Sequence, residues 1–298
     1  MSNRPDGKTT EFEGRVVVVT GAGTGLGRAH ALWFASRGAK VVVNSRRRAD
    51  GPPTALAVVR EITESGGAAV LSEHSVEKEG DSRALIELAH SHFGKLDILV
   101  CNAGISPPLV PLTEVSLDVF REVMNVNFYG SLYPIHAALP EMIMRGYGRI
   151  VVTTSTAGYY GEHGAAAYSA SKAALIGLVR SIGIECQDTG VRANLTAPVA
   201  YTRLMKDHAN PRAEKILPPS RVSPVVGWLS SEKCDRSGLI ITGGGGRFYR
   251  TGVIEGPIHQ LDADNVSDLW PRMKELEGGT ESERSFESLL GRFPELAG

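Results

Sequence analysis

Tyr168 and Lys172 are the residues whose types and spacing point most directly to chemistry. They lie four positions apart in the stretch 168–172 (YSASK), which is one turn of a helix, so both side chains would project from the same face. A free tyrosine has a pKa of about 10, and an ammonium group about 4 Å away would lower it by roughly three units at an effective dielectric of about 20. The pair predicts a general acid/base that works at neutral pH, although such a short motif also arises by chance.

A glycine-rich turn follows the first apolar stretch of the chain. Residues 15–20 (RVVVVT) read as a strand, and Gly21, Gly25 and Gly27 follow with the spacing G-x-x-x-G-x-G. Glycines let a backbone turn sharply and approach a pyrophosphate, while the helix that begins here offers N–H groups to the anion. The turn predicts a dinucleotide site; the alternative is a glycine-rich turn that binds nothing.

The end of the second apolar run indicates which dinucleotide is bound. An acidic residue at this point would accept hydrogen bonds from the adenosine ribose and repel a 2′-phosphate. The chain instead has Asn44-Ser45-Arg46, followed by Arg47 and Arg48. Ser45 removes the repulsion and a guanidinium group can bind a phosphate with two hydrogen bonds, so we expect NADP to be favoured, with NAD possible. Arg47 and Arg48 also fit a merely solvated charge run.

The elements that must position these groups alternate along the chain. Seven β-branched runs read as strands, and they are apolar without alternation, as in a parallel sheet covered on both faces. These runs are residues 15–20, 40–44, 68–72, 98–102, 149–155, 192–196 and 239–242, and the helical stretches are 25–37, 54–65, 81–93, 116–145, 168–188 and 220–230. The alternation predicts an α/β fold, a single doubly wound Rossmann domain with a parallel sheet of about seven strands. Ligands would bind at the carboxyl ends of the strands.

Composition is that of an ordinary globular protein. The hydrophobic fraction is 42%, and the formal net charge of −1 gives no general attraction to nucleic acid or to an anionic membrane. No apolar run approaches the roughly 18 residues that span a bilayer, and the polar N-terminus lacks the apolar core of a signal peptide. Cys101, Cys186 and Cys234 are too widely spaced for a metal site and suggest reduced thiols. We expect a cytoplasmic protein with no metal and no nucleic-acid or membrane partner.

The last part of the chain has a different composition. Residues 253–298 contain ten acidic residues and four basic ones. Residues 265–277 read as a helix, and the rest is rich in Glu, Ser and Gly. We therefore expect a flexible N-terminus over residues 1–11, a dinucleotide-binding catalytic domain over 12–252 and an acidic C-terminal extension over 253–298. The extension is open to three interpretations: a solvated tail, a flap over the active site, or an arm on a neighbouring subunit.

Taken together, these residues resemble the short-chain dehydrogenase/reductase family over residues 12–250. The turn with Gly21, Gly25 and Gly27 is similar to the coenzyme motif of the family, and the stretch 102–104 (NAG) matches the Asn-Ala-Gly that follows its fourth strand. The resemblance implies a set of coenzyme-binding residues. They are Gly21, Thr24, Gly25, Leu26, Gly27, Ser45, Arg46, Ser75, Val76, Asn102, Ala103, Gly104, Tyr168, Lys172, Pro198 and Val199.

The same resemblance implies four catalytic residues. Ser155 lies thirteen residues before Tyr168, where the family has its catalytic serine, and Asn127 stands where it keeps an active-site asparagine. Tyr168 would exchange a proton with the substrate oxygen, and Ser155 would orient that oxygen. Lys172 would hold the nicotinamide ribose and lower the pKa of Tyr168, while Asn127 would fix a water between the lysine and solvent.

Within the family, the chain looks most similar to the (3R)-hydroxyacyl-CoA dehydrogenase subgroup, the dehydrogenase part of peroxisomal multifunctional enzyme type 2. The similar stretches are residues 12–16, 147–150, 197–198, 243–247 and 265–276. Members act on 3-hydroxyacyl-CoA thioesters and some on steroid alcohols. Three positions depart from the usual pattern: Ser45 and Ser75 stand where aspartates are usual, and Val199 replaces a common glycine. The NAD preference of the subgroup therefore does not carry over.

Three loops are expected to form the substrate site, over residues 106–109, 156–161 and 200–205. Their large side chains make it apolar, which suits an acyl chain or a sterol, although they equally fit ordinary packing or an interface; they are Tyr159, Tyr160, Tyr201, Leu204 and Met205. We expect an oxidoreductase acting on a bulky secondary alcohol or ketone, and a homo-oligomer, either a dimer or a tetramer. The alternatives are a small-carbonyl reductase and a non-catalytic nucleotide-sensing scaffold.

Overall fold

The structure is a computed structural model that describes residues 11–46, 54–202, 212–255 and 280–281. The chain divides into two compact units, Met1–Arg250 and Thr251–Gly298. In the second unit, Ile254–Glu255 (β9) pairs antiparallel with Thr280–Glu281 (β10). Several parts of the chain discussed above lie outside the described residues. They are residues 1–10 of the expected N-terminal segment, the predicted helix over residues 265–277, and the individual residues Arg47, Arg48, Leu204 and Met205.

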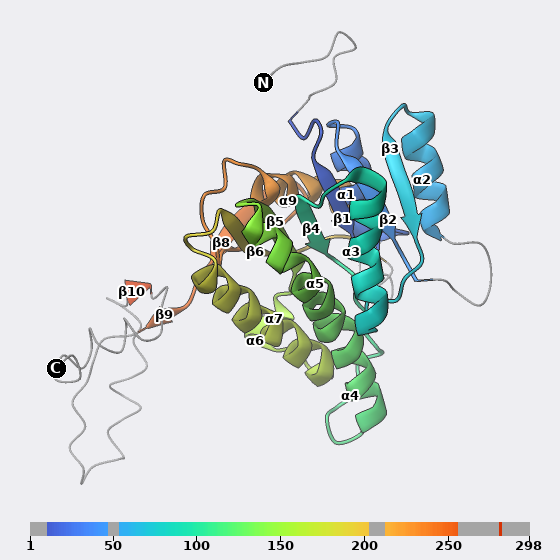
Figure 1. The fold of residues 1–298 in the computed structure, drawn as a ribbon. Helices are drawn as coiled ribbons and strands as arrows, with labels where there is room; N and C mark the ends of the chain where they lie inside the picture. The colour runs from blue at the N-terminus through green and yellow to red at the C-terminus, as the bar shows by residue number, and fades with distance from the viewer. Residues whose placement is uncertain (1–10, 47–53, 203–211, 256–279, 282–298) are drawn as a thin grey trace, which may run out of the picture. The chain divides into compact units, whose positions relative to one another are not determined.

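The first unit is built around one twisted sheet with helices on both faces (Figure 1). Its strands are Val16–Val19 (β1), Lys40–Asn44 (β2), Ala68–Ser72 (β3), Ile98–Cys101 (β4), Gly148–Thr153 (β5), Val191–Pro198 (β6), Ile240–Gly244 (β7) and Arg247–Thr251 (β8). They are arranged in the order β3-β2-β1-β4-β5-β6-β7-β8, and β1 pairs in parallel with both β2 and β4. The strand order therefore reverses beside β1, where doubly wound sheets bind ligands.

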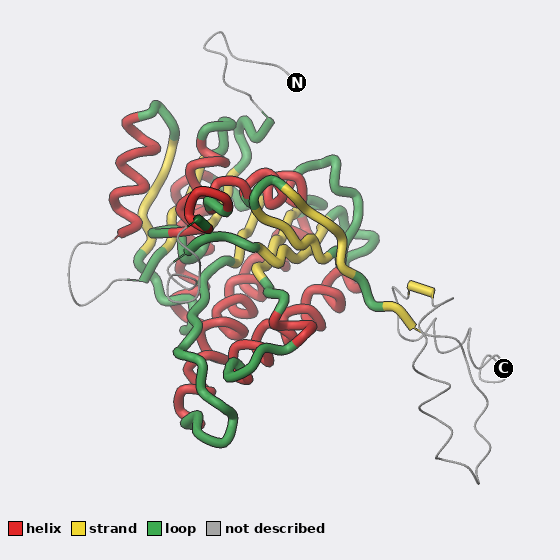
Figure 2. The backbone as a smooth tube through the Cα atoms, turned by 180° about the vertical axis from the view of Figure 1, so that it is seen from behind, coloured by secondary structure: helices red, strands yellow, loops and turns green. Residues whose placement is uncertain are grey.

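Two apolar cores cover the two faces of this sheet. Glu79–Phe93 (α3), Gly130–Met144 (α5) and Ala166–Glu185 (α7) pack on one face, and Gly25–Ala35 (α1), Thr54–Glu64 (α2) and Ser223–Ser230 (α9) pack on the other (Figures 1 and 2). On β1, Val16 and Val18 join the first core while Val17 and Val19 join the second. All four are fully buried, because successive side chains of a strand point to opposite faces and both faces are covered. This explains the runs of valine and confirms the predicted fold class.

The sheet has one strand, β8, in addition to the seven runs recognised in the sequence. Gly245 and Gly246 join β7 to β8 and have φ angles of 60° and 87°, as a two-residue hairpin turn requires. A turn this short makes β8 run antiparallel to β7 at the edge of the otherwise parallel sheet. Residues 247–250 are all exposed, so β8 lacks the apolar run by which the other strands were recognised.

The single helix predicted over residues 116–145 is divided in the structure. Leu117–Met124 is α-helical (α4), Asn125–Tyr129 forms one wider π-helical turn, and α5 continues from Gly130. Three further short helices are Ala157–Tyr160 (α6), Ala213–Ile216 (α8) and the 3-10 turn Pro219–Arg221. Within the described ranges, no helix combines the length and the apolar character needed to cross a membrane.

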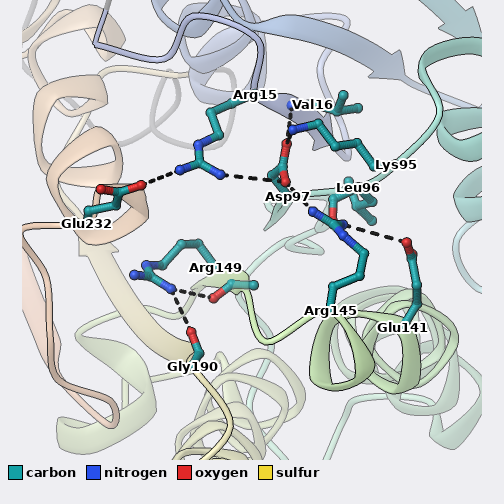
Figure 3. Close-up of polar contacts among 11 residues, drawn as sticks. Arg15, Val16, Lys95, Leu96, Asp97, Glu141, Arg145, Arg149, Gly190 and Glu232 are labelled. Carbon is teal, nitrogen blue, oxygen red and sulfur yellow. Dashed lines mark hydrogen bonds and ion pairs between the residues drawn. The ribbon is translucent and has the colours of Figure 1, made fainter.

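A buried carboxylate ties together the amino ends of the central strands (Figure 3). Asp97, fully buried just before β4, accepts a hydrogen bond from the backbone N–H of Val16 at 2.9 Å. Its carboxylate also pairs with Lys95 at 2.8 Å and with Arg145 at 2.5 Å, and Arg15 lies 3.8 Å away. Burial alone would raise the pKa of Asp97, but these hydrogen bonds outweigh it and lower that pKa. The cluster fastens β1, β4 and the end of α5 at the edge opposite the glycine-rich turn.

Candidate active site

The predicted Tyr168–Lys172 pair lies on α7, the longest helix of the described structure, with both side chains turned to the same side. The Lys172 Nζ atom is 5.7 Å from the centroid of the Tyr168 ring. Lys172 is 3% exposed, and its ammonium donates a hydrogen bond to the carbonyl oxygen of Thr153 at 2.8 Å. The hydroxyl of Thr154 in turn donates to the carbonyl of Lys172 at 2.8 Å. Two hydrogen bonds therefore fix this turn of α7 to the carboxyl end of β5.

Burial governs the titration of both groups. It lowers the pKa of Lys172 from 10.5 to about 8, because the charged ammonium is removed from water. It raises the pKa of Tyr168 above 10.0, against the opposing effect of a hydrogen bond with Ser155. The lowered tyrosine pKa expected from the sequence is therefore not found, although Tyr168 and Lys172 do lie close together. Removal of the phenol from water raises its pKa by more than the hydrogen bond with Ser155 lowers it.

Ser155 meets Tyr168 at the carboxyl end of β5. Its side chain lies within hydrogen-bonding range of the phenol, and this interaction lowers the pKa of Tyr168. The same hydroxyl oxygen accepts a hydrogen bond from the backbone N–H of Ala157 at 3.2 Å, at the start of α6. Ser155, Tyr168 and Lys172 thus converge on one end of the sheet, although they come from two different elements.

Asn127 occupies the π-helical turn and is fully buried. Its side-chain oxygen accepts from the N–H of Ile105 at 2.8 Å, and its amide donates to the carbonyl of Ile105 at 3.0 Å and to the hydroxyl of Ser171 at 3.0 Å. A Cβ atom on Gly104 would lie 3.3 Å from Asn127 Oδ1 and 3.5 Å from Lys172 Nζ. Asn127, Lys172 and the loop after β4 therefore meet. Both amide hydrogens are donated within the protein, so Asn127 could hold a water only by accepting from it.

The glycine-rich turn after β1 is shaped by close backbone contacts. Gly21 has a φ of 64°, and a Cβ atom there would come within 2.8 Å of Ala103 Cα. A Cβ atom on Gly27 would come within 2.3 Å of the carbonyl oxygen of Gly21. Thr24 precedes α1 without a side-chain cap, and the first turn of the helix contains no acidic residue. The turn and the helix end therefore fit an anionic group such as a pyrophosphate.

Thr20 is an organising residue whose role the sequence analysis did not anticipate. Its hydroxyl oxygen accepts hydrogen bonds from the backbone N–H groups of Asn102 at 2.9 Å and Ala103 at 3.0 Å. The amide of Asn102 donates back to the carbonyl of Thr20 at 3.0 Å. These bonds lock the glycine-rich turn to the loop after β4. A hydroxyl between a strand and a glycine turn was the available signal, but its two partners are 82 and 83 residues away along the chain.

The expected adenosine end of the site lies where β2 and β3 finish. Ser45 donates its backbone N–H to the carbonyl of Ser72 at 3.0 Å, and Ser75 donates its N–H to Asp81 at 2.9 Å. The exposed guanidinium of Arg46 lies 3.3 Å from the carboxylate of Glu77, a partner that the sequence analysis did not identify. Val76 is buried in the core, so its backbone, not its side chain, remains for a ligand.

The remaining expected residues are divided between the site and the core. Val199, beyond β6, donates its N–H to the carbonyl of Gly243 at 2.8 Å, which extends the pairing past Pro198. Leu26 is partly buried and packs against the core between the sheet and α1. Of the expected substrate residues, Tyr159 packs against the core and its hydroxyl is 2.8 Å from that of Thr242. Tyr160 is 78% exposed, so these two neighbouring tyrosines have different environments.

Comparisons with known proteins identify the family of the chain. The family model for short chain dehydrogenases matches residues 15–213. A short-chain type dehydrogenase/reductase of Mycobacterium tuberculosis is 36% identical, over 89% of this chain and 95% of its own. The crystal structure of a short chain dehydrogenase from Mycobacterium avium has a TM-score of 0.78 at 34% identity, and covers 88% of this chain and 95% of its own.

A longer relative matches the chain as well. The peroxisomal multifunctional enzyme type 2 of Drosophila melanogaster is 40% identical over 91% of this chain, which spans 47% of the length of that enzyme. Both the family model and these relatives cover most of the first unit. This chain belongs to the short-chain dehydrogenase/reductase family.

Proposed function

We propose that the protein is an NAD(P)(H)-dependent oxidoreductase that interconverts a secondary alcohol and a ketone. The observation that carries the proposal is the convergence of Tyr168, Ser155 and Lys172 at the carboxyl end of β5. Membership in a family of dehydrogenases supports an enzyme that transfers hydride. A nucleotide-sensing scaffold without turnover is the weaker alternative, because such a protein has no use for a buried acid/base group beside a serine.

Tyr168 would act on the substrate oxygen. Because burial raises its pKa, the phenol keeps its proton at neutral pH and can donate it to a ketone oxygen during reduction. The hydroxyl of Ser155 would donate a hydrogen bond to the same oxygen and orient it. A bound nicotinamide coenzyme supplies the hydride for reduction or accepts it for oxidation. In the oxidative direction, the nearby ammonium of Lys172 would favour the phenolate that must form.

The coenzyme would be held by the turn after β1 and the loop after β4. The free N–H groups at the start of α1 would bind the pyrophosphate, and Asn102, Ala103 and Gly104 would line the path toward Lys172. At the adenosine end, Ser45 leaves room for a 2′-phosphate and Arg46 could bind it, so we propose that NADP(H) is favoured and NAD(H) is also accepted. The ion pair between Arg46 and Glu77 bears on the choice between them.

We propose a bulky apolar substrate, a 3-hydroxyacyl-CoA thioester or a steroid-like alcohol. The relative from Drosophila is a multifunctional enzyme, and this chain is similar to about half of it. Leu109 and Tyr160, on two of the loops expected to flank the substrate, are exposed apolar side chains that could contact an acyl chain or a sterol. A small-carbonyl reductase is the alternative within the same chemistry.

The test is a Tyr168→Phe variant assayed with NADH and NADPH on acetoacetyl-CoA, a steroid ketone and a small aldehyde. We expect turnover to fall by orders of magnitude, with NADH or NADPH binding retained in a fluorescence titration. Tyr249→Phe is the matched control, because it removes a hydroxyl from an exposed tyrosine on β8 that has no part in the proposed site. Unchanged turnover in Tyr168→Phe would refute the mechanism. The carbonyl compound that the natural protein reduces fastest would decide the substrate class.

Cellular location and assembly are further parts of this proposal. We propose a cytoplasmic homo-oligomer, either a dimer or a tetramer. On α7, Ala170, Ala173 and Gly177 are small residues that permit a second helix to approach closely. Sedimentation at several protein concentrations would measure the oligomeric state, and a sharp monomer throughout would contradict the proposal.

A further inference from the structure

We propose that Glu77 is a specificity-determining residue for the coenzyme: its carboxylate neutralises Arg46 and so weakens the selection of a 2′-phosphate. The inference rests on the proposed function, because it assumes that the adenosine end of the coenzyme lies where β2 and β3 finish. It goes beyond that function by assigning the preference between NAD(H) and NADP(H) to a residue on a different strand connection from Arg46.

The two charges meet although 31 positions separate them along the chain. Arg46 follows β2 by two residues, and Glu77 lies in the connection between β3 and α3. Because β2 and β3 are parallel neighbours, their carboxyl ends lie at the same edge of the sheet. Arg46 Nη1 is 3.4 Å from Glu77 Oε1 and 3.3 Å from Oε2, so the carboxylate faces the guanidinium with both oxygens.

The position of Glu77 is held by its neighbours. Ser75 is fixed by its hydrogen bond to Asp81, and Val76 is buried while its carbonyl accepts from the hydroxyl of Ser82 at 2.9 Å. The backbone on the N-terminal side of Glu77 is thus anchored to α3, and Glu77 is less exposed than Arg46, with 26% of its side chain accessible against 51%. The carboxylate is therefore the more buried partner of the pair.

The charges of Arg46 and Glu77 together decide whether this site favours a 2′-phosphate or a 2′-hydroxyl. Arg46 alone would offer one positive charge to a 2′-phosphate, which carries a charge of about −1.5 to −2 at neutral pH. Glu77 cancels that charge and would stand a few ångströms from the phosphate, where like charges repel even in water. A ribose with a free 2′-hydroxyl carries no charge and avoids this repulsion. The end of β2 carries Ser45 in place of an acidic residue, but Glu77, in the connection between β3 and α3, places a carboxylate close to the same point.

The test measures binding of two probes, 2′,5′-ADP and 5′-AMP, by calorimetry at low ionic strength. They differ only in the 2′-phosphate, so the ratio of their affinities isolates the effect of that group and needs no turnover. For Glu77→Gln we expect 2′,5′-ADP to bind about tenfold more tightly and 5′-AMP to change less than twofold. The gain should shrink in high salt, which screens exposed charges.

A matched control and a second variant make the result specific. Glu79→Gln removes the same charge two positions away, where Glu79 pairs with Arg83 and not with Arg46, and we expect both affinities to stay unchanged. Adding Arg46→Gln to Glu77→Gln should abolish the gain. If the gain persists without Arg46, or if Glu77→Gln alters both probes equally or neither, the inference is overturned.

The same titrations separate this inference from the proposed function. If 5′-AMP binds and Glu77→Gln has no effect on the ratio, only the inference fails, and the coenzyme site stands. If neither probe binds to any variant while circular dichroism shows folded protein, the assumed coenzyme site is wrong and both proposals fall.

Discussion

Lys172 Nζ lies 2.8 Å from the carbonyl oxygen of Thr153, so the ammonium group of the proposed active site is anchored to the end of β5. The bond fixes the cation beside the loop after β4, where a Cβ atom on Gly104 would be only 3.5 Å away. It also partly compensates the ammonium for the loss of water, because the side chain is almost completely buried.

The stability of the fold should depend on the protonation of Lys172. The pKa of this group is about 8 in the folded protein and 10.5 as its ordinary value, so the unfolded chain binds more protons between these two pH values. Stability contributed by this site should therefore rise with pH from about 8 to 10.5, by up to about 3 kcal/mol. Urea unfolding of Tyr168→Phe and of Tyr168→Phe/Lys172→Met across this range isolates the lysine. A constant difference between the two variants would contradict the lowered pKa.

Removal of the Asn127 amide should be costly. Asn127→Leu has a similar volume but removes the side-chain partner of the N–H and C=O of Ile105 and the hydrogen bond that the hydroxyl of Ser171 accepts. We expect a loss of about 2–4 kcal/mol in the free energy of unfolding, measured by chemical denaturation. Ser171→Ala, which leaves the two bonds to Ile105 intact, should lose about 1 kcal/mol. Equal stability of Asn127→Leu and the natural protein would show that the two bonds to Ile105 contribute nothing.

A side chain at Gly27 should destroy the turn that we assign to the coenzyme. In Gly27→Ala the new methyl group would lie 2.3 Å from the carbonyl oxygen of Gly21 and 2.6 Å from the amide of Asn102, so the backbone must shift. We expect loss of NADH and NADPH binding in a fluorescence titration. Gly80→Ala is the control, because a methyl group there meets no neighbour within 4 Å and should slightly raise helix stability. Full binding by Gly27→Ala would mean that the turn does not hold the coenzyme.

Asp97 should contribute stability that is lost in acid. Its pKa is lowered from the ordinary value of 3.8 in the folded protein, so its contribution is complete above that value and disappears as the pH falls through the folded pKa. Asp97→Asn should lose about 3–5 kcal/mol at neutral pH, because the carboxylate holds Lys95, Arg145 and the N–H of Val16 together (Figure 3). Thermal unfolding from pH 7 to pH 3 should show the two proteins converging. A pH-independent difference would contradict this account.

Much of the fold could be predicted because the signals are local. Strands such as β1 show their double burial in an unbroken run of valines, and the glycine turn after β1 follows from its spacing. The strand β8 was missed because residues 247–250 are exposed and carry no apolar pattern. The π-helical turn at Asn127 was missed because a single extra residue per turn leaves the helical periodicity of the surrounding segment nearly unchanged.

The sequence by itself determined the α/β alternation, the family resemblance and the pairing of Tyr168 with Lys172 on one helical turn. Each of these depends on residue types within a few positions of one another, where backbone geometry fixes the spacing. Only the tertiary structure decided the contact of Arg46 with Glu77, the clamp of Asn127 on Ile105 and the direction of the Tyr168 pKa shift. Those features depend on which strand ends lie side by side and on how much water the packed chain excludes. Neither can be predicted from the spacing of residues that are close in the sequence.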